Sequence, residues 1–321
     1  MSRAGLEAWL TRRWYGRRPV WWLLPLSALY LAATTLRRVF TRRVRVGVPV
    51  VVVGNVTVGG SGKTPVALAL VETLRAEGWT PGVVSRGYGA RVPGVRVLRD
   101  GDSADAVGDE PALMARHGAP VAIGADRVAA ARALLAARPD VDVLVADDGL
   151  QHYRLARDVE VVVIDATRGF GNGALLPAGP LRERVARIAR ADAALTAAKD
   201  PRGYTRYALQ LGDAQALTSG VEPRPLASFR GGRVNAVAGI GDPRRFFNQL
   251  ARLGIFVNPR PFPDHHRFTA TDLAFGDGLP VLMTEKDAVK CAAFDGADRW
   301  FVPIRAVLPA PVIDLIRRKL T

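Results

Sequence analysis

The 321-residue chain contains a single cysteine, Cys291. One thiol excludes an internal disulfide framework and any metal site built from several cysteines. The scarcity of cysteine is compatible with a reducing compartment. With 49% hydrophobic and 23% charged residues the composition is that of a globular protein, and the length allows two domains of ordinary size.

Acidic residues are almost missing from the first 48 positions, where Glu7 is the only one. Ten arginines against this one glutamate leave +9 of the net charge of +15 in that segment. Such a segment can face nucleic acid or anionic lipid. The eighteen residues from Pro19 to Leu36 are uncharged, which favours lipid and no nucleic-acid partner. Residues typical of the membrane interface surround this stretch: Trp14, Tyr15, Trp21, Trp22 and Tyr30.

The uncharged stretch is near the lower limit for crossing a bilayer, roughly 17–25 residues, and we expect Pro25 to interrupt it. Both flanks are basic, which by the positive-inside rule keeps both ends on the cytoplasmic side. We therefore predict that residues 1–45 form a membrane-associating segment whose helix lies in or dips into the inner leaflet. A soluble helix packed on the next domain is the alternative. We expect no cleavable signal peptide, because the apolar stretch starts late and lacks a small-residue cleavage site.

Residues 50–73 have the pattern of a phosphate-binding loop. Val50–Val53 predicts a buried strand, and an apolar helix follows with Pro65 in its first turn. In such a P-loop the glycines let backbone N–H groups converge on phosphate oxygens at a helix N-terminus. The lysine reaches the outer phosphates and the threonine hydroxyl binds Mg²⁺. The predicted nucleotide-binding residues are Gly59, Gly60, Ser61, Gly62, Lys63, Thr64 and Pro65.

The loop lacks the first glycine of the usual pattern. Counting back from Gly62, G-x-x-x-x-G-K-[ST] places a glycine at position 57, where this chain has Thr57. An ordinary glycine-rich turn is the alternative interpretation. We favour the P-loop because Gly-Lys-Thr at a strand-to-helix junction rarely arises by accident.

Two adjacent aspartates end a second apolar strand. Val141–Ala146 predicts the strand, and Asp147 and Asp148 follow. An acid at the end of a strand downstream of a P-loop is typical of the Mg²⁺ side of a nucleotide site. Adjacent side chains on a strand point to opposite faces, so one aspartate could bind the metal directly and the other through water. A polar turn is the alternative.

Strand and helix patterns alternate along the rest of the chain and begin again near residue 231. This alternation predicts an α/β fold in two parts. We expect a P-loop kinase domain over 46–200, a connector over 201–230 and a smaller α/β lobe over 231–321. The sequence shows no internal repeat.

A cleft between two lobes would need acid–base residues, and Asp264-His265 is the most suggestive pair. From the residues alone this pair could be functional or structural. Asp109 reads more readily as an ordinary acid at a helix N-terminus. Arg182 and Glu183 could serve phosphate and metal, or could begin a solvated helix.

Eight motifs in one order resemble the tetraacyldisaccharide 4′-kinase family over almost the whole chain: GNVTVGGSGKTP, SRGYG, GDEP, VADDGLQH, LLPAGPLRE, GIGDP, FPDHH and TEKD. That family also has a small hydroxyl residue at the position of Thr57. The resemblance implies an α/β/α P-loop core, a smaller α/β lobe, ATP as donor and Mg²⁺ as cofactor. The acceptor would be the 4′-hydroxyl of the acylated glucosamine disaccharide 1-phosphate precursor of lipid A. The protein would then lie at the cytoplasmic side of the inner membrane of a Gram-negative bacterium.

The resemblance also implies roles for individual residues. Asp109 would take the proton of the acceptor hydroxyl with His265 beside it, which overturns the simpler interpretation of Asp109. His266 would have no catalytic role. The implied catalytic residues are Asp109, His265, Lys63 and Arg182. Outside the loop, the implied nucleotide contact is Gln151, and the implied metal contacts are Thr64, Asp147, Asp148 and Glu183.

A function from another class would use many of the same features. A membrane-tethered P-loop ATPase that switches a protein partner would need the loop, the aspartate pair and the N-terminal segment. It would give no role to Asp109 and His265.

Overall fold

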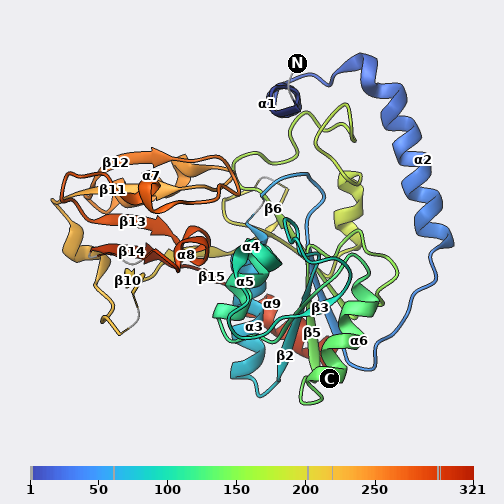
Figure 1. Cartoon of the computed structure of the whole chain (residues 1–321). Helices are drawn as coiled ribbons and strands as arrows, with labels where there is room; N and C mark the ends of the chain where they lie inside the picture. Colours follow the sequence, from blue (N-terminus) through green and yellow to red (C-terminus); the bar gives the residue numbers. More distant parts are fainter. Residues whose placement is uncertain (1–2, 61, 201, 219, 295, 297) are drawn as a thin grey trace.

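The computed structural model describes residues 3–321 except 61, 201, 219, 295 and 297. The chain folds into two α/β lobes that lie side by side (Figure 1). An N-terminal helical segment runs along the outer side of the larger lobe. The predicted two-part α/β architecture is therefore present.

The larger lobe is built on an eight-stranded sheet with the order β3-β4-β2-β5-β1-β6-β7-β8. Every neighbouring pair is parallel except β3 with β4. The central strands are buried on both faces and rich in valine, as expected of a parallel sheet covered by helices. In chain order the strands are β1 (Val50–Gly54), β2 (Pro81–Ser85), β3 (Arg96–Val97), β4 (Val121–Ile123), β5 (Val143–Asp147), β6 (Val159–Ile164), β7 (Ala193–Thr196) and β8 (Thr205–Arg206).

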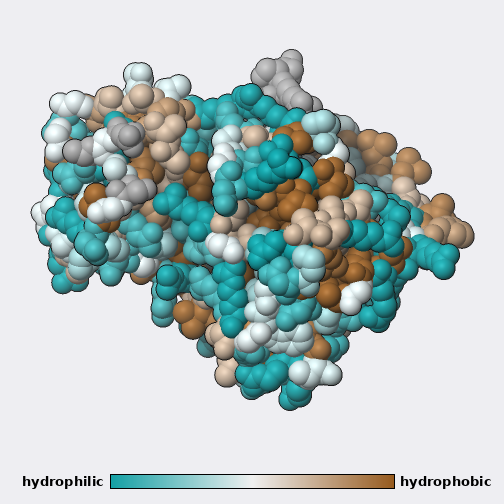
Figure 2. All heavy atoms as spheres, turned by 60° about the horizontal axis from the view of Figure 1, so that its bottom comes forward, coloured by the Kyte–Doolittle hydropathy of each residue, from teal (hydrophilic) through white to brown (hydrophobic). Residues whose placement is uncertain are grey.

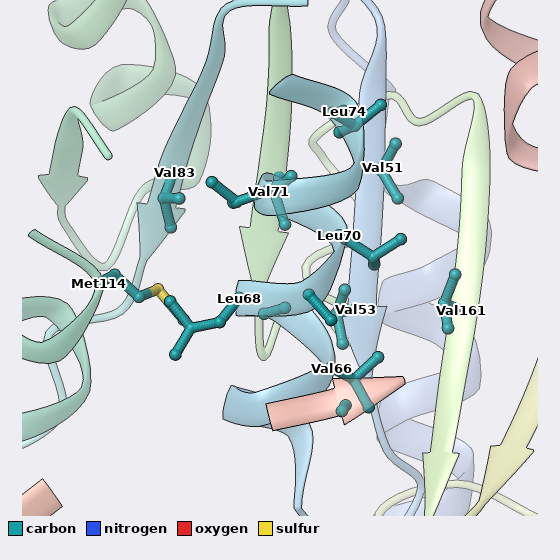
Figure 3. Packing of buried hydrophobic residues seen from close by; sticks show 14 of the residues in the cluster. Val51, Val53, Val66, Leu68, Leu70, Val71, Leu74, Val83, Met114 and Val161 are labelled. Atoms are coloured by element: carbon teal, nitrogen blue, oxygen red, sulfur yellow. The ribbon is translucent and has the colours of Figure 1, made fainter. Parts of the chain in front are cut away.

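Helices cover both faces of this sheet. On one face Val66 and Leu70 of the helix after the P-loop pack against Val51 and Val53 of β1 (Figure 3). The helices on this face are α3 (Lys63–Ala76), α4 (Ala104–Val107), α5 (Asp109–Arg116) and α9 (Ala310–Leu320). The other face carries α6 (Arg127–Ala137) and the 3₁₀ helix η2 (Val185–Arg190). These layers confirm the predicted α/β/α core.

The smaller lobe has a five-stranded sheet with the order β10-β14-β13-β11-β12, parallel except for β10. Its strands are β10 (Gln215–Ala216), β11 (Arg233–Ala238), β12 (Phe256–Pro261), β13 (Val281–Thr284) and β14 (Arg299–Val302). Its helices are α7 (Pro243–Arg252), α8 (Glu285–Cys291) and the 3₁₀ helices η3 (Leu226–Phe229) and η4 (Ala270–Leu273). Phe246 and Leu250 of α7 fill one face of the sheet, and Phe268 and Cys291 fill the other.

The chain passes between the lobes twice. The two passages pair as an antiparallel ribbon of β9 (Ala208–Leu211) and β15 (Ile304–Val307). After β15 the chain returns to the larger lobe, where Val312 and Ile316 of α9 join the main core. The predicted smaller lobe of 231–321 is therefore wrong at its end, because the apolar side of α9 is buried on the larger sheet.

The N-terminal segment consists of α1 (Arg3–Trp14), the 3₁₀ helix η1 (Trp21–Leu23) and α2 (Leu24–Phe40). Pro25 lies in the first turn of α2, where a missing N–H costs nothing. Our expectation that Pro25 interrupts the helix was wrong for this reason. Within the described residues, no helix is both long and apolar enough to cross a membrane.

Helix α2 is docked by one side only. The Ser27 hydroxyl donates to the Leu175 carbonyl over 2.9 Å, and the Tyr30 hydroxyl donates to the Arg182 carbonyl over 3.1 Å. The opposite side is apolar and exposed, and apolar side chains gather over α2 at the right of Figure 2. The exposed large residues of η1 and α2 are Trp21, Trp22, Leu24, Leu26, Leu29, Leu36, Val39 and Phe40.

Candidate active site

The glycine-rich loop lies where β1 leads into α3. Gly59 and Gly62 have φ angles of 99° and 79°, which only glycine adopts without strain. The helix begins at Lys63, and its first turn leaves backbone N–H groups free for a phosphate. Both features agree with the predicted P-loop. Ser61, which we expected to contact the nucleotide, lies outside the described residues.

A cavity of about 200 Å³ separates the P-loop from the smaller lobe. Glu110 and Asp264, the sequence neighbours of Asp109 and His265, border this cavity. The larger lobe lines it with Gly60, Gly62, Thr64 and Pro65 of the predicted nucleotide site. Part of the predicted nucleotide site and the sequence neighbours of Asp109 and His265 therefore line one cleft.

Thr57 serves a structural purpose at the position of the missing glycine. It is buried and forms a backbone bridge with Leu181. On either side the Val58 N–H donates to the Pro180 carbonyl, and the Arg182 N–H donates to the Val56 carbonyl over 2.7 Å. The start of the loop thus has extended backbone that pairs with the segment carrying Arg182.

Asp148 holds two cations of the site together. Its Oδ1 lies 3.0 Å from Arg182 Nη1 and 3.4 Å from Lys63 Nζ. Burial acts to raise the pKa of Asp148, but Lys63 and Arg182 outweigh it and lower that pKa to about 2. Asp148 also has a φ of 47°, a strained value that turns it away from the strand direction. Lys63, Asp148 and Arg182 therefore form one cluster, an arrangement that the sequence did not predict.

Asp147 ends β5 and is fully buried, and neither carboxylate oxygen has a hydrogen-bond partner in the described part of the chain. Burial, followed by the charge of Glu110, raises the pKa of Asp147 to about 7. A buried carboxylate without partners fits a divalent cation, which prefers oxygen ligands. The described residues contain no cluster of three or more His, Cys, Asp or Glu that could hold a metal. Magnesium at nucleotide sites needs only one or two carboxylates, with phosphates and water completing its shell.

Glu183 already uses both of its carboxylate oxygens. Oε2 accepts from the Tyr153 hydroxyl over 2.5 Å and lies 3.5 Å from Arg187 Nε, and Oε1 accepts from Gln151 Nε2 over 3.0 Å. The Oε1 atom of Gln151 in turn accepts from Arg182 over 3.1 Å. Glu183 thus orients Gln151 and, through it, the guanidinium of Arg182.

Asp109 and His265 meet across the boundary between the lobes. Asp109 begins α5, and the Nδ1–H of His265 donates to its Oδ2 over 3.0 Å. His265 has a φ of 59°, and its ring lies 5.3 Å from that of Tyr88. Burial acts to raise the pKa of Asp109, but the bond from His265 and the nearby lysine charges lower it below the usual range of a carboxyl. The left-handed backbone of His265 and the contact between the lobes make this pair a candidate functional site.

Two lysines of α8 also belong to this region, and the sequence analysis did not identify them. Lys286 Nζ lies 3.5 Å from Glu110 Oε1, and Lys290 Nζ lies 3.8 Å from Asp109 Oδ2. The TEKD motif was the available signal, but nothing in it shows that α8 packs against α5. That contact arises only when the two lobes come together.

Comparison with known proteins identifies the family of this chain. Residues 19–321 match the family described as tetraacyldisaccharide-1-P 4′-kinase. The chain belongs to this family. A tetraacyldisaccharide 4′-kinase of Aromatoleum aromaticum is 51% identical over 100% of this chain and 98% of its own. The enzyme of the same name from Dechloromonas aromatica is 47% identical over 98% of each chain.

A solved structure shows that the fold is shared. The LpxK of Aquifex aeolicus, crystallised in complex with ATP, has a TM-score of 0.77 and 29% identity to this chain. The similarity covers 93% of this chain and 98% of that one. Membership of the kinase family thus extends over both lobes and the cleft between them.

Proposed function

We propose that the protein transfers the γ-phosphoryl group of ATP to the 4′-hydroxyl of the tetraacylated glucosamine disaccharide 1-phosphate. The product would be the 1,4′-bisphosphate, lipid IVA, an intermediate of lipid A synthesis. The names of the relatives and of the ATP-bound neighbour support this donor and acceptor. The observation that carries the proposal is the Asp109–His265 pair between the lobes, whose sequence neighbours Glu110 and Asp264 border the P-loop cleft.

A sugar hydroxyl becomes a competent nucleophile only when a positioned base takes its proton. Asp109 is suited to this role because its lowered pKa keeps it ionised at neutral pH. The hydrogen bond from His265 fixes the Oδ2 atom of Asp109. The hydroxyl proton then passes to Asp109 as the new oxygen–phosphorus bond forms and ADP leaves.

The other half of the site carries the charge of the phosphates. Lys63 and Arg182, now paired with Asp148, lie where they can bind phosphoryl oxygens. The P-loop N–H groups bind the remaining oxygens at the start of α3. Thr64 and Asp147, with Asp148, are the residues that would hold Mg²⁺, and the ion would neutralise charge on the transferred group. We propose Gln151 as a nucleotide-side contact; Glu183 remains a predicted metal contact that would first have to leave Tyr153.

We also propose that α2 seats the enzyme on the cytoplasmic face of an anionic membrane, where a lipid acceptor resides. Its apolar side is exposed, and basic residues lie at both ends of the uncharged stretch. The bond from Tyr30 to the Arg182 carbonyl connects this helix with the phosphate cluster. This surface gives no reason to propose a nucleic-acid partner.

The direct test is transfer of γ-phosphate from ATP to the detergent-solubilised disaccharide 1-phosphate, followed by mass spectrometry of the lipid. We expect the mass of one added phosphoryl group, and its loss when ATP or Mg²⁺ is withheld. Normal ATP binding without lipid phosphorylation would contradict the proposal. Hydrolysis stimulated by a protein partner, with no phosphorylated lipid, would favour the membrane-tethered switch instead.

A further inference from the structure

The smaller lobe brings a buried lysine to Asp109. Lys290 lies near the end of α8, and only 4% of its side chain is exposed. Its Nζ is 3.8 Å from the Oδ2 atom of Asp109, which belongs to the larger lobe. The proposed base therefore has a cation beside it that comes from the other side of the cleft.

Lys290 is held firmly in this position. Asp287, one turn earlier on α8, places its Oδ1 2.7 Å from Lys290 Nζ. The other oxygen of Asp287 accepts from the Gly239 N–H over 2.9 Å and from the Thr284 hydroxyl over 2.5 Å. The ring of Phe268 lies 5.0 Å from the ammonium group. A desolvated lysine is costly unless acids compensate it, and its two near acids are Asp287 and Asp109.

His265 and Lys286 are the other charged or titratable groups that act on the carboxylate of Asp109. His265 donates from Nδ1 to Asp109. On the other side of its ring, Nε2 of His265 lies 3.9 Å from Oδ1 of Asp264. Lys286 of α8 lies between Glu110, at 3.5 Å, and Asp264, at 3.9 Å, so two other acids share its charge. Among the described residues, Lys290 is the lysine whose ammonium lies within 4 Å of the Asp109 carboxylate.

The contacts of Asp109 fall on one oxygen. His265 Nδ1 and Lys290 Nζ both face Oδ2. No hydrogen bond or ion pair is found for Oδ1 within the described chain. One oxygen is therefore anchored by the smaller lobe, and the other is available to an incoming hydroxyl group.

We propose that Lys290 is a positioning residue that keeps Asp109 ionised and its Oδ1 free for the acceptor hydroxyl. The inference rests on the proposed role of Asp109 as base. In the step it supports, the hydroxyl proton moves to Oδ1 while the oxygen–phosphorus bond to the acceptor forms. The bond between the γ-phosphorus and its bridging oxygen breaks, and the electron pair leaves with ADP.

An opposite charge at this distance lowers the pKa of a carboxyl by about 1–3. Removing it should therefore return Asp109 toward its neutral, inactive form as the pH falls. Burial acts to raise the pKa of Asp109, but the hydrogen bond from His265 and then the charges of Lys290 and Lys286 lower it, in agreement with this expectation.

The test compares Lys290→Met with wild type over pH 5.0–8.0 at saturating ATP. The ratio of the two kcat values cancels the titration of ATP itself. We expect the ratio to be nearly constant above pH 7.5 and to fall roughly threefold by pH 5.0 as Asp109 becomes protonated. Lys290→Arg should keep the ratio flat. Lys319→Met is the matched control, because it removes the charge of a surface lysine that pairs with Asp192.

A structural defect has to be separated from this effect, because Lys290→Met leaves the buried Asp287 without its cation. The double variant Asp287→Asn/Lys290→Met removes both charges and should show the same pH-dependent loss with less thermal destabilisation. Two results would overturn the proposal. In one, the ratio of variant to wild-type kcat is reduced by the same factor at every pH; in the other, it equals one at every pH. The titration midpoint of Asp109, followed by ¹³C NMR of its carboxyl, should rise by roughly two pH units in the double variant.

The same measurements separate this inference from the role of Asp109. If Asp109→Asn keeps full activity, Asp109 is not the base, whatever Lys290 does. If Asp109→Asn is inactive and the Lys290→Met ratio stays flat, only the role of Lys290 is wrong.

Discussion

At the scale of single residues, the site consists of two clusters with different duties. Lys63, Asp148 and Arg182 gather positive charge at the mouth of the P-loop. Asp109, the proposed base, and His265 are hydrogen-bonded to each other at the boundary between the two lobes. In the proposed reaction the first cluster would bind the phosphoryl group, and the second would act on the hydroxyl that attacks it.

Lys63→Met should lower kcat by about 10²–10³-fold, because one preorganised charge on the phosphoryl oxygens is lost. The side chain is not part of the hydrophobic core, so thermal unfolding should stay close to that of wild type. Steady-state kinetics with the lipid acceptor and a melting curve provide the check. Turnover above a tenth of wild type would mean that Arg182 and the backbone suffice.

Asp109→Asn should lower kcat by about 10²–10⁴-fold, the usual contribution of a general base. The KM for ATP should change little, because the nucleotide is held by the P-loop. Steady-state kinetics with ATP as the varied substrate measures both quantities. A raised KM for ATP with a normal kcat would contradict this role.

At the scale of elements, α2 is a helix that exposes large apolar side chains to solvent. Leu29 and Leu36 are 66% and 62% exposed on its free side. Burying a leucine is worth about 1.5–3 kcal/mol, and 1.4 kcal/mol is a factor of ten. An exposed apolar side of this size indicates a membrane or protein surface.

Leu29→Ser and Leu36→Ser should each lower partition onto anionic vesicles by about tenfold, because each removes one apolar side chain from the bilayer. Sedimentation with vesicles containing phosphatidylglycerol measures the change. Val221→Ser and Phe256→Ser are matched controls, since these apolar residues are 51% and 59% exposed on the smaller lobe. Equal losses in the controls would move the membrane contact away from α2.

At the scale of the whole molecule, the two lobes are held together by charged contacts as well as by the β9–β15 ribbon. His117, which follows α5, places Nε2 2.9 Å from Glu285 Oε1 of α8. The hydrogen bond to Glu285 raises the pKa of His117, and burial opposes the rise only in part. The charged imidazole therefore stabilises the contact between the lobes.

This contact should make stability depend on pH. Since the folded pKa of His117 lies above its unfolded value of about 6.5, its contribution is complete below pH 6.5. It should be lost as the pH rises through the folded pKa. Thermal unfolding from pH 5.5 to 8.5 should show wild type more stable than His117→Gln at low pH, with the difference shrinking on the alkaline side. A constant difference would mean that His117 is neutral in the folded protein.

Local patterns were sufficient for much of this protein. Each of three features lies within a single short segment: the valines of β1, the glycines of the loop and the acids at the end of β5. Their spacing alone predicts a strand, a turn and carboxylates near a metal ion. The partner of Asp109 could not be found in this way, because residues 109 and 265 come from different lobes. Pro25 was misread because its cost depends on where the helix begins.

The sequence by itself determined the elements, the P-loop chemistry and the family, since these depend on the order and type of neighbouring residues. Only the tertiary structure decided that α9 returns to the larger lobe and that Thr57 pairs with the segment of Arg182. The tertiary structure alone also placed Lys290 beside Asp109. Such contacts join residues far apart in the chain, so they depend on how helices and sheets bury their apolar faces together.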